Sequence, residues 1–161
     1  MPSMKKVELT AFDLAGRFLG LTERAGNLEN HPLIVWWFEL CGLPKQPDEV
    51  PWCSVFLNGL CWLLGPDVPR SKSAAARSWL TVAQAVSLDQ AIIGWDVVIL
   101  KRGAGPQPGP DVFDAPGHVG LFAGRLNGDV LVRGGNQQNS VNDTRFPGHR
   151  VLGVRRLLPL E

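Results

Sequence analysis

The pattern of apolar and polar positions divides the chain into two halves of different character. In the first half, apolar residues recur every three or four positions, which is the spacing of an amphipathic helix. This spacing, with glycine and proline as end signals, predicts helices over residues 8–19, 32–40 and 51–65. A further short helix is predicted over residues 73–80, with Ser71 or Ser73 as its N-terminal cap.

The second half has the pattern of β-strands. After Gly94, short runs rich in β-branched residues alternate with glycine-containing turns. The segment from Arg102 to Gly117 is too long and too rich in proline and glycine for a tight hairpin, so we expect either a functional rim or a mobile loop there. The predicted strands lie at 95–100, 118–122, 129–133 and 151–155.

Helices followed by a meander of strands predict an α+β fold, in which N-terminal helices pack on a C-terminal antiparallel β-sheet. The helical part spans about residues 8–90 and the sheet part about residues 94–157. A chain of 161 residues is long enough to bury a core of its own, and no internal repeat is visible. We therefore expect one domain over residues 1–161, acting as a monomer.

Composition and charge exclude several classes of partner. The 16 Lys and Arg residues nearly balance the 15 Asp and Glu residues, which argues against broad binding of nucleic acid or anionic membrane. No stretch approaches the roughly 18 uninterrupted apolar residues of a membrane span, and the N-terminus lacks the apolar core of a signal peptide. Three cysteines without disulfide-type spacing favour synthesis in a reducing compartment.

Cys53 is the first candidate for chemistry. It follows Pro51, a residue that suits a first helical turn, so its thiol should lie near unpaired N–H groups and the positive end of the helix dipole. Such a setting lowers the pKa of a thiol and favours the nucleophilic thiolate. The alternative is a small buried core residue, which is what we expect of Cys41 and Cys61.

A thiolate nucleophile needs a base, and the chain has three histidines. His31 and His149 lie in polar turns and are expected at the surface. His118 begins a strand, and that strand would bring its imidazole to Cys53 if it packed against the start of the Cys53 helix. On the next strand, Asn136 could bond the other ring nitrogen, although Gly-Gly-Asn-Gln is also typical of a strand end.

Several ordered motifs, from about the first helix to Arg155, together carry a resemblance. They are Pro51-Trp52-Cys53-Ser54 with Phe56 and Asn58, Ser73-Ala-Ala-Ala-Arg-Ser-Trp79, Gly94-Trp-Asp96, Gly117-His118-Val-Gly120, Gly134-Gly-Asn136-Gln137 and Val151-Leu-Gly-Val-Arg155. In this order they resemble the CHAP and NlpC-type papain-like cysteine peptidases, and more narrowly the small single-domain group found in phage lysis cassettes and prophages.

The resemblance implies a papain-like fold and an endolysin-like peptidoglycan hydrolase that needs no cofactor. Cys53 would be the nucleophile and His118 the general base, and the enzyme would cut amide bonds of cell-wall muropeptides as an N-acetylmuramoyl-L-alanine amidase or an endopeptidase. The wider group often carries a glutamate two residues before the asparagine of the third motif, where this chain has Gly134. Asn136 would therefore orient His118 alone.

The substrate contacts are less defined. The backbone N–H of Cys53 is aimed at one oxyanion position, but the sequence does not indicate which side chain would be the second donor. Asp48 and Gln137 are expected at the substrate, although Asp48 could instead cap the helix or bind calcium, without the dense carboxylate loop of calcium sites. Most of the six tryptophans are expected in the core, while Trp52 is either core or the floor of a muropeptide groove.

Other functions have weaker support. A zinc amidase would need two or three ligand histidines, and no HxH or HExxH spacing occurs. No pair of carboxylates marks a glycosidase. The sequence leaves open a phage enzyme that waits in the host bacterial cytoplasm until a membrane pore releases it, a secreted antibacterial toxin, and a catalytically inactive wall-binding or virion protein.

Overall fold

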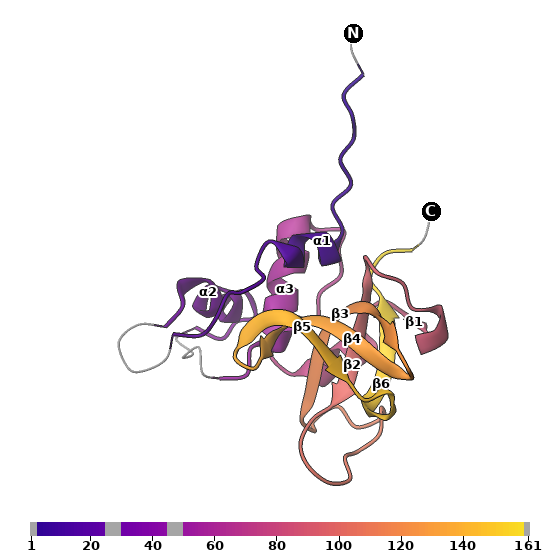
Figure 1. Cartoon of the computed structure of the whole chain (residues 1–161). Helices are drawn as coiled ribbons and strands as arrows, with labels where there is room; N and C mark the ends of the chain where they lie inside the picture. The colour runs from indigo at the N-terminus through magenta and orange to yellow at the C-terminus, as the bar shows by residue number, and fades with distance from the viewer. Residues whose placement is uncertain (1–2, 25–29, 45–49, 160–161) are drawn as a thin grey trace.

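Helices lead and strands follow, which confirms the predicted α+β order (Figure 1). The computed structural model describes residues 3–24, 30–44 and 50–159. Its helices there are α1 (Ala11–Gly16), α2 (Pro32–Leu40) and α3 (Cys53–Leu64), with 3₁₀ helices η1 (Ala76–Thr81), η2 (Leu88–Gln90) and η3 (Gly148–Arg150). The strands are β1 (Gln84–Val86), β2 (Asp96–Lys101), β3 (Gly117–Leu126), β4 (Asp129–Gln137), β5 (Ser140–Phe146) and β6 (Val151–Arg156).

The strands form one antiparallel sheet in the order β1-β6-β2-β3-β4-β5. Strands β2 to β5 follow one another as a meander, and β6 returns to pair with β2 on its other side. The sequence did not predict β1 or β5. The turn into β5 contains Gln138 and Asn139, both with positive φ, as a two-residue type I′ hairpin turn requires. The polar segment after Gln137 is thus an edge strand rather than a loop.

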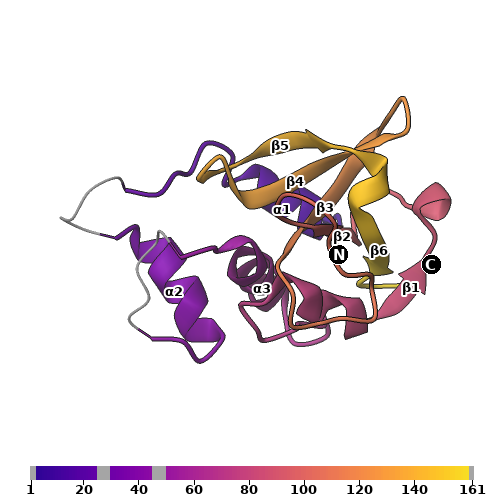
Figure 2. The ribbon, with the colours of Figure 1, turned by 90° about the horizontal axis from the view of Figure 1, so that it is seen from below.

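Helix α3 lies at the centre of the helical layer. Every residue from Cys53 to Cys61 is buried, because α1, α2 and strands β3 and β4 surround the helix. A helix that is apolar on all sides needs such surroundings. Helix α2 packs on the side of α3 that faces away from the sheet (Figure 2). The first turn of α3 therefore meets the sheet where β3 begins.

The two faces of the sheet cover different cores, because side chains alternate along each strand. On the face toward α3, Val97, Ile99 and Val119 join the main core. On the opposite face, Val98, Leu100 and Val132 belong to a second apolar cluster. Successive residues of β3 therefore serve opposite faces, and this alternation places His118 and Val119 on different sides.

Several helix boundaries differ from the prediction for local reasons. Helix α1 begins at Ala11 because Thr10 and Asp13 form a reciprocal capping box. Helix α3 begins at Cys53, with Trp52 rather than Pro51 at its start. The predicted helix over 73–80 is a 3₁₀ helix from Ala76, and neither Ser71 nor Ser73 caps it. Instead, the carbonyl of Ser73 accepts a hydrogen bond from Ser54 Oγ at 2.6 Å, which ties this segment to α3.

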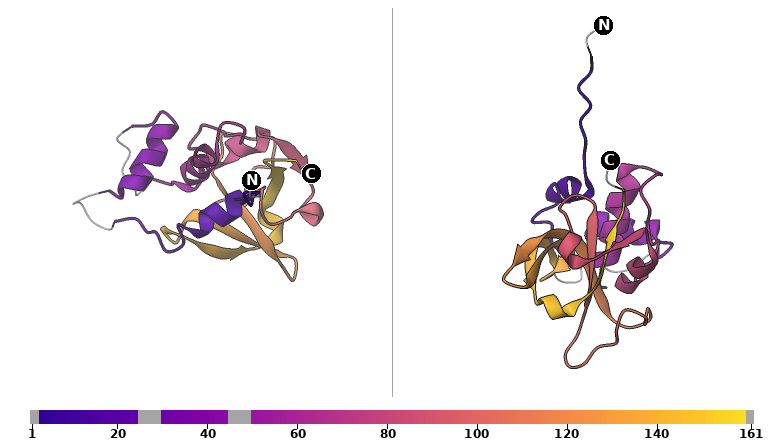
Figure 3. Two further views of the ribbon diagram at one scale, coloured as in Figure 1. Left: turned by 90° about the horizontal axis from the view of Figure 1, so that it is seen from above. Right: turned by 90° about the vertical axis from the view of Figure 1, so that its right-hand side faces the viewer.

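The N-terminal residues 3–9 have no regular structure and run away from the rest of the chain (Figures 1 and 3). None of the helices in the described ranges has the length and apolar character that a membrane crossing requires.

Candidate active site

Cys53 is the first residue of α3, and its side chain is 3% exposed. The backbone N–H groups of a first helical turn have no partner within the helix. The thiol lies against the start of β3, where both the His118 side chain and the Val119 backbone N–H hydrogen-bond to it. Helix α3 and strand β3 therefore bring together two residues that are far apart in the sequence.

The two side chains form a coupled acid–base pair. Burial raises the pKa of Cys53, but the positive charge of His118 and hydrogen bonds from His118 and Val119 outweigh it, so the pKa falls below its ordinary value. Burial lowers the pKa of His118, yet the Cys53 thiolate and hydrogen bonds with Cys53 and Gln137 raise it overall. The pair thus favours thiolate and imidazolium, which is the form a cysteine nucleophile needs.

Gln137 holds the histidine ring. Its Oε1 lies 2.9 Å from His118 Nε2, and its amide nitrogen donates to the carbonyls of Val132 at 3.1 Å and Asn142 at 2.7 Å. Because the amide nitrogen is engaged there, Oε1 must accept from His118, so Nε2 carries a proton. The other ring nitrogen, Nδ1, is left for Cys53.

The structure therefore corrects the place given to Asn136 and Gln137. The residue bonded to His118 is Gln137, which we expected at the substrate, and not Asn136. The cause is a bulge in β4: Gly134 pairs with Asn142 and Gln137 with Ser140, so β4 contains one extra residue. In a regular strand Asn136 would share the face of Gly134; the bulge, with Asn136 at φ +57°, moves Gln137 onto that face.

Gly134 makes room for this arrangement. A Cβ atom at position 134 would lie 2.8 Å from Gln137 Oε1, closer than real side-chain contacts allow. The position where the resembling group often carries a glutamate is therefore free of a side chain, and the amide of Gln137 occupies the space. A side chain at position 134 would collide with Gln137, so the residue at this position determines whether Gln137 can orient His118.

Trp52 is a core residue, so of the two places expected for it the floor of a substrate groove is wrong. Its side chain is 0% exposed and stacks on Trp37, with ring centroids 6.2 Å apart. Its indole N–H donates to Glu23 Oε1 at 2.8 Å. A Cβ atom at Gly135 would lie 2.5 Å from the ring, so the ring packs directly on the backbone of β4. The buried ring supports the start of α3 and has no exposed surface that a ligand could contact.

The segment from Arg102 to Gly117 is anchored by Arg77, which sequence reasoning did not single out as functional. Arg77 is fully buried and donates to the carbonyls of Pro108, Gly109, Val112 and Pro116, at 2.8–3.0 Å. A buried guanidinium with this many acceptors fixes a chain without regular structure. Because Pro116 precedes Gly117 and His118, Arg77 also sets the path of the chain into β3.

Two cavities lie near His118, one lined by His118 itself and the other by its neighbour Gly117, and they share Arg102 as a wall. The first, of about 210 Å³, has Lys101, Arg102 and Arg150 in its lining but no Asp or Glu, and Asn136 lies here. The second, of about 500 Å³, lies beside Pro51 and residues 74–76. Arg150 bonds the carbonyl of Gly103 at 2.8 Å, whereas Arg102 is exposed. The wall beside the histidine therefore carries positive charge without a carboxylate, whereas Asp114 lines the second cavity.

The other candidates from the sequence lie elsewhere. Asp48 falls outside the described residues. His31 precedes α2 and its Nδ1 accepts from the Leu33 N–H at 3.2 Å, while His149 is exposed in η3. Cys61 is buried in the core and Cys41 is half-buried. Within the described ranges, no three His, Cys, Asp or Glu side chains gather as metal ligands would.

Comparisons with known proteins bear on the fold. No protein-family model matches the sequence, and no curated protein sequence matches it. Among solved structures, NlpC1 from Trichomonas vaginalis is similar, with a TM-score of 0.52 and 18% identity over 91% of this chain. The chain covers 42% of that protein. This structural similarity shows that the chain has an NlpC-type, papain-like fold. It does not assign the chain to the narrower phage group.

Proposed function

We propose that the protein is a cysteine-dependent peptidoglycan hydrolase that cuts an amide bond of bacterial cell-wall muropeptides. The observation that carries the proposal is the pairing of Cys53, at the first turn of α3, with a His118 ring whose far nitrogen is held by Gln137. A nucleophile, a base and an orienting group in contact are what covalent amide hydrolysis requires. The NlpC-type fold supports the same activity.

In the proposed reaction, the Cys53 thiolate attacks the amide carbonyl carbon and forms a C–S bond. The resulting oxyanion accepts a hydrogen bond from the unpaired backbone N–H at the start of α3. His118 then gives its Nδ1 proton to the amide nitrogen, the C–N bond breaks and the amine leaves. Water next loses a proton to His118 and adds to the thioester, and cleavage of the C–S bond releases a carboxylic acid and restores the thiolate.

The charge of the site supports a muropeptide as substrate. Lys101, Arg102 and Arg150 line the cavity beside His118 with no acidic residue among its walls. Stem peptides of the wall carry free carboxylates, which such a cavity would attract. Both an N-acetylmuramoyl-L-alanine amidase and an endopeptidase would use this arrangement, because the two differ in which amide carbonyl reaches Cys53.

The test is digestion of purified sacculi, with the products identified by mass spectrometry. Wild-type protein is expected to produce either glycan with free lactyl carboxylates and free stem peptides, which indicate an amidase, or new amino termini within the stem, which indicate an endopeptidase. Cys53→Ala should release neither. EDTA should leave the release intact and iodoacetamide should abolish it. Release that persists in Cys53→Ala, or that EDTA abolishes, would show the cysteine mechanism to be wrong.

An endolysin-like role is the setting we propose for this activity, with bacterial peptidoglycan as the partner. Added to cells stripped of their outer membrane, the wild-type protein should reduce turbidity and Cys53→Ala should not. An antibacterial toxin would show the same lysis but would be encoded beside an immunity gene. Binding to sacculi without any released product would instead indicate an inactive wall-binding protein.

A further inference from the structure

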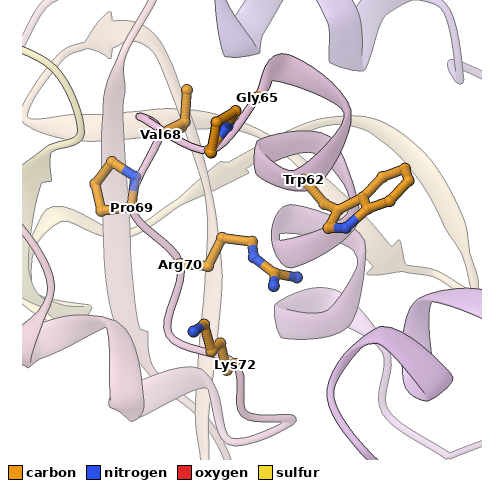
Figure 4. Close-up of a pocket in the computed structure, with 7 residues that line it drawn as sticks. Trp62, Gly65, Val68, Pro69, Arg70 and Lys72 are labelled. Carbon is orange, nitrogen blue, oxygen red and sulfur yellow. The ribbon is translucent and has the colours of Figure 1, made fainter.

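A cavity of about 660 Å³ opens at the C-terminal end of α3, away from the candidate active site. Its walls come from the last turn of α3 and from residues 65–72, and Figure 4 shows Arg70 between Trp62 and Lys72. Cys53 begins the same helix, and Trp62 lies in its last turn, so the two sites lie about 14 Å apart along its axis. Nothing in the proposed reaction uses this second cavity.

The charge of this cavity is positive and unbalanced. Arg70 and Lys72 line it, whereas neither Asp nor Glu does. The Nη1 atom of Arg70 is buried and has no hydrogen-bond partner among the described residues. A buried guanidinium nitrogen without an acceptor is costly, so the positive charge of Arg70 is left without compensation, and an anion that entered the cavity would gain a charge-assisted interaction with the guanidinium.

An aromatic surface lies beside these cations. Trp62 is 48% exposed, whereas Trp37, Trp52 and Trp79 are fully buried and the remaining two are half-buried. Its ring is held by an edge contact with Trp36, at 5.3 Å between centroids. A large rigid ring exposed next to a charged group provides contact area at little entropic cost.

The walls of the cavity are preformed. Asn58, buried on α3, accepts from the backbone N–H of Lys72 at 2.8 Å and donates to Ser71 Oγ at 3.1 Å. This holds Lys72 at φ +56°, a conformation that a residue with a side chain adopts at a cost. The loop that carries both cations is therefore fixed before any ligand arrives, which lowers the entropic cost of binding.

From these observations we propose that the cavity formed by Trp62, Arg70 and Lys72 binds an anionic sugar of the cell-wall glycan, namely a muramyl residue that carries no stem peptide and whose lactyl carboxylate is therefore free. The face of the sugar ring packs on the indole of Trp62, and its carboxylate accepts from the guanidinium of Arg70 and from Lys72. The choice of a wall sugar rests on the proposed function, but binding requires no catalysis. The site would hold the glycan at a peptide-free sugar while α3 presents Cys53, at its other end, to the stem peptide of another sugar.

The test is an NMR titration of the wild-type protein labelled on its tryptophan indoles, with Trp62→Phe used to assign the Trp62 signal. N-acetylmuramic acid is expected to move the Trp62 signal, whereas N-acetylglucosamine, which lacks the lactyl carboxylate, and inorganic phosphate at equal concentration should move it far less. Arg70→Gln should weaken N-acetylmuramic acid binding by about tenfold or more. Leu63→Ala, an exposed neighbour outside the cavity, should leave it unchanged.

Equal responses to the two sugars, or to phosphate alone, would overturn the assignment to an anionic sugar. Binding that survives in both Arg70→Gln and Trp62→Ala would overturn the site itself. These outcomes are independent of Cys53: a protein that binds N-acetylmuramic acid here but does not hydrolyse sacculi would contradict the proposed function and leave this inference standing. Hydrolysis of sacculi without binding of N-acetylmuramic acid in this cavity would contradict this inference and leave the proposed function standing.

Discussion

Cys53 and Cys61 occupy the same helix, eight positions apart, and both are buried in the same core. Their acid–base properties nevertheless diverge. Burial raises the pKa of Cys61 to about 12, and the charge of Arg70 offsets this only in part. Burial acts on Cys53 in the same direction, yet interactions with His118 and Val119 lower its pKa below the ordinary value. Both thiols lie on α3 and both are buried, so their pKa values differ because of the groups on other segments that contact them.

The contacts of the two thiols explain the difference. Cys53 lies where the first turn of α3 meets the start of β3, so a ring nitrogen and a backbone N–H both reach its sulfur. Cys61 lies two turns later, and within the described part of the chain no such donor reaches its sulfur. A thiolate without donors in an apolar environment is strongly disfavoured. One helix thus carries a reactive and an inert cysteine.

The largest expected effect separates the two thiols by activity. Cys53→Ala should lower the rate of muropeptide release at least about 10⁴-fold, because the nucleophile is lost. Cys61→Ala should retain most of the wild-type rate. The measurement is initial release of soluble muropeptides from sacculi by both variants in parallel. A comparable loss in both would mean that Cys53 acts through the core and not as the nucleophile.

Removing the histidine should make Cys53 behave like Cys61. In His118→Ala, burial is no longer offset, so the pKa of Cys53 should rise, and the thiolate fraction at pH 7 should fall about tenfold for each unit of the rise. The rate of iodoacetamide alkylation at pH 7, followed by mass spectrometry of the Cys53 peptide, measures this. Native Cys61 should stay unmodified in both proteins. An unchanged alkylation rate would show that His118 does not activate the thiol.

The same pair predicts the pH dependence of the wild-type enzyme. The active form has a deprotonated Cys53 and a protonated His118. Since the Cys53 pKa is lowered and the His118 pKa is raised, kcat/KM should rise with pH through the lowered thiol pKa and fall as pH passes the raised imidazole pKa. The plateau therefore requires the first pKa to lie below the second. A profile that only rises toward pH 9 would contradict this order.

A smaller effect should distinguish the neighbours Gln137 and Asn136. Gln137→Ala removes the acceptor from His118 Nε2 and should lower kcat about 10- to 100-fold, with a shifted pH profile that a purely structural defect would not produce. Asn136→Gly suits the positive φ at this position and should stay within a few-fold of the wild-type rate. Gln137→Glu, which keeps an acceptor, should recover part of the activity. A greater loss in Asn136→Gly would restore Asn136 as the orienting residue.

The smallest effect concerns stability. Cys61→Ser places a hydroxyl in an apolar site and should lower the free energy of unfolding by about 1–3 kcal/mol. Cys61→Ala should cost less, because it leaves only a small void. Urea unfolding followed by fluorescence measures both. A larger loss for Cys61→Ala than for Cys61→Ser would indicate that the sulfur site is polar.

Much of the architecture follows from local patterns. The period of apolar positions located α2 and α3 closely and placed four of the six strands, because these elements have clear one- or two-sided burial. Strand β5 escaped prediction because its sequence, Ser140–Phe146, is largely polar and its turn contains no glycine. The two asparagines and the glutamines near that turn were the available signal, since asparagine tolerates positive φ.

The residues of the site also divide into those that the sequence could predict and those that it could not. Cys53 and His118 were identifiable as candidates because a cysteine at a helix start and a histidine at a strand start can meet without being close in sequence. Arg77 was not, because only the folded chain shows four carbonyls converging on one buried guanidinium. Trp52 was ambiguous because sequence cannot tell which face of an aromatic residue will be covered.

By itself, the sequence determined the order of elements, the character of α3 and the presence of a cysteine and a histidine at element ends, because these depend on residue periodicity and on local end signals. Only the tertiary structure decided which amide holds the histidine and which cysteine is activated. Both choices depend on contacts between distant segments: a one-residue bulge in β4 turns Gln137 toward His118, and the packing of α3 on β3 gives Cys53 the donors that Cys61 lacks.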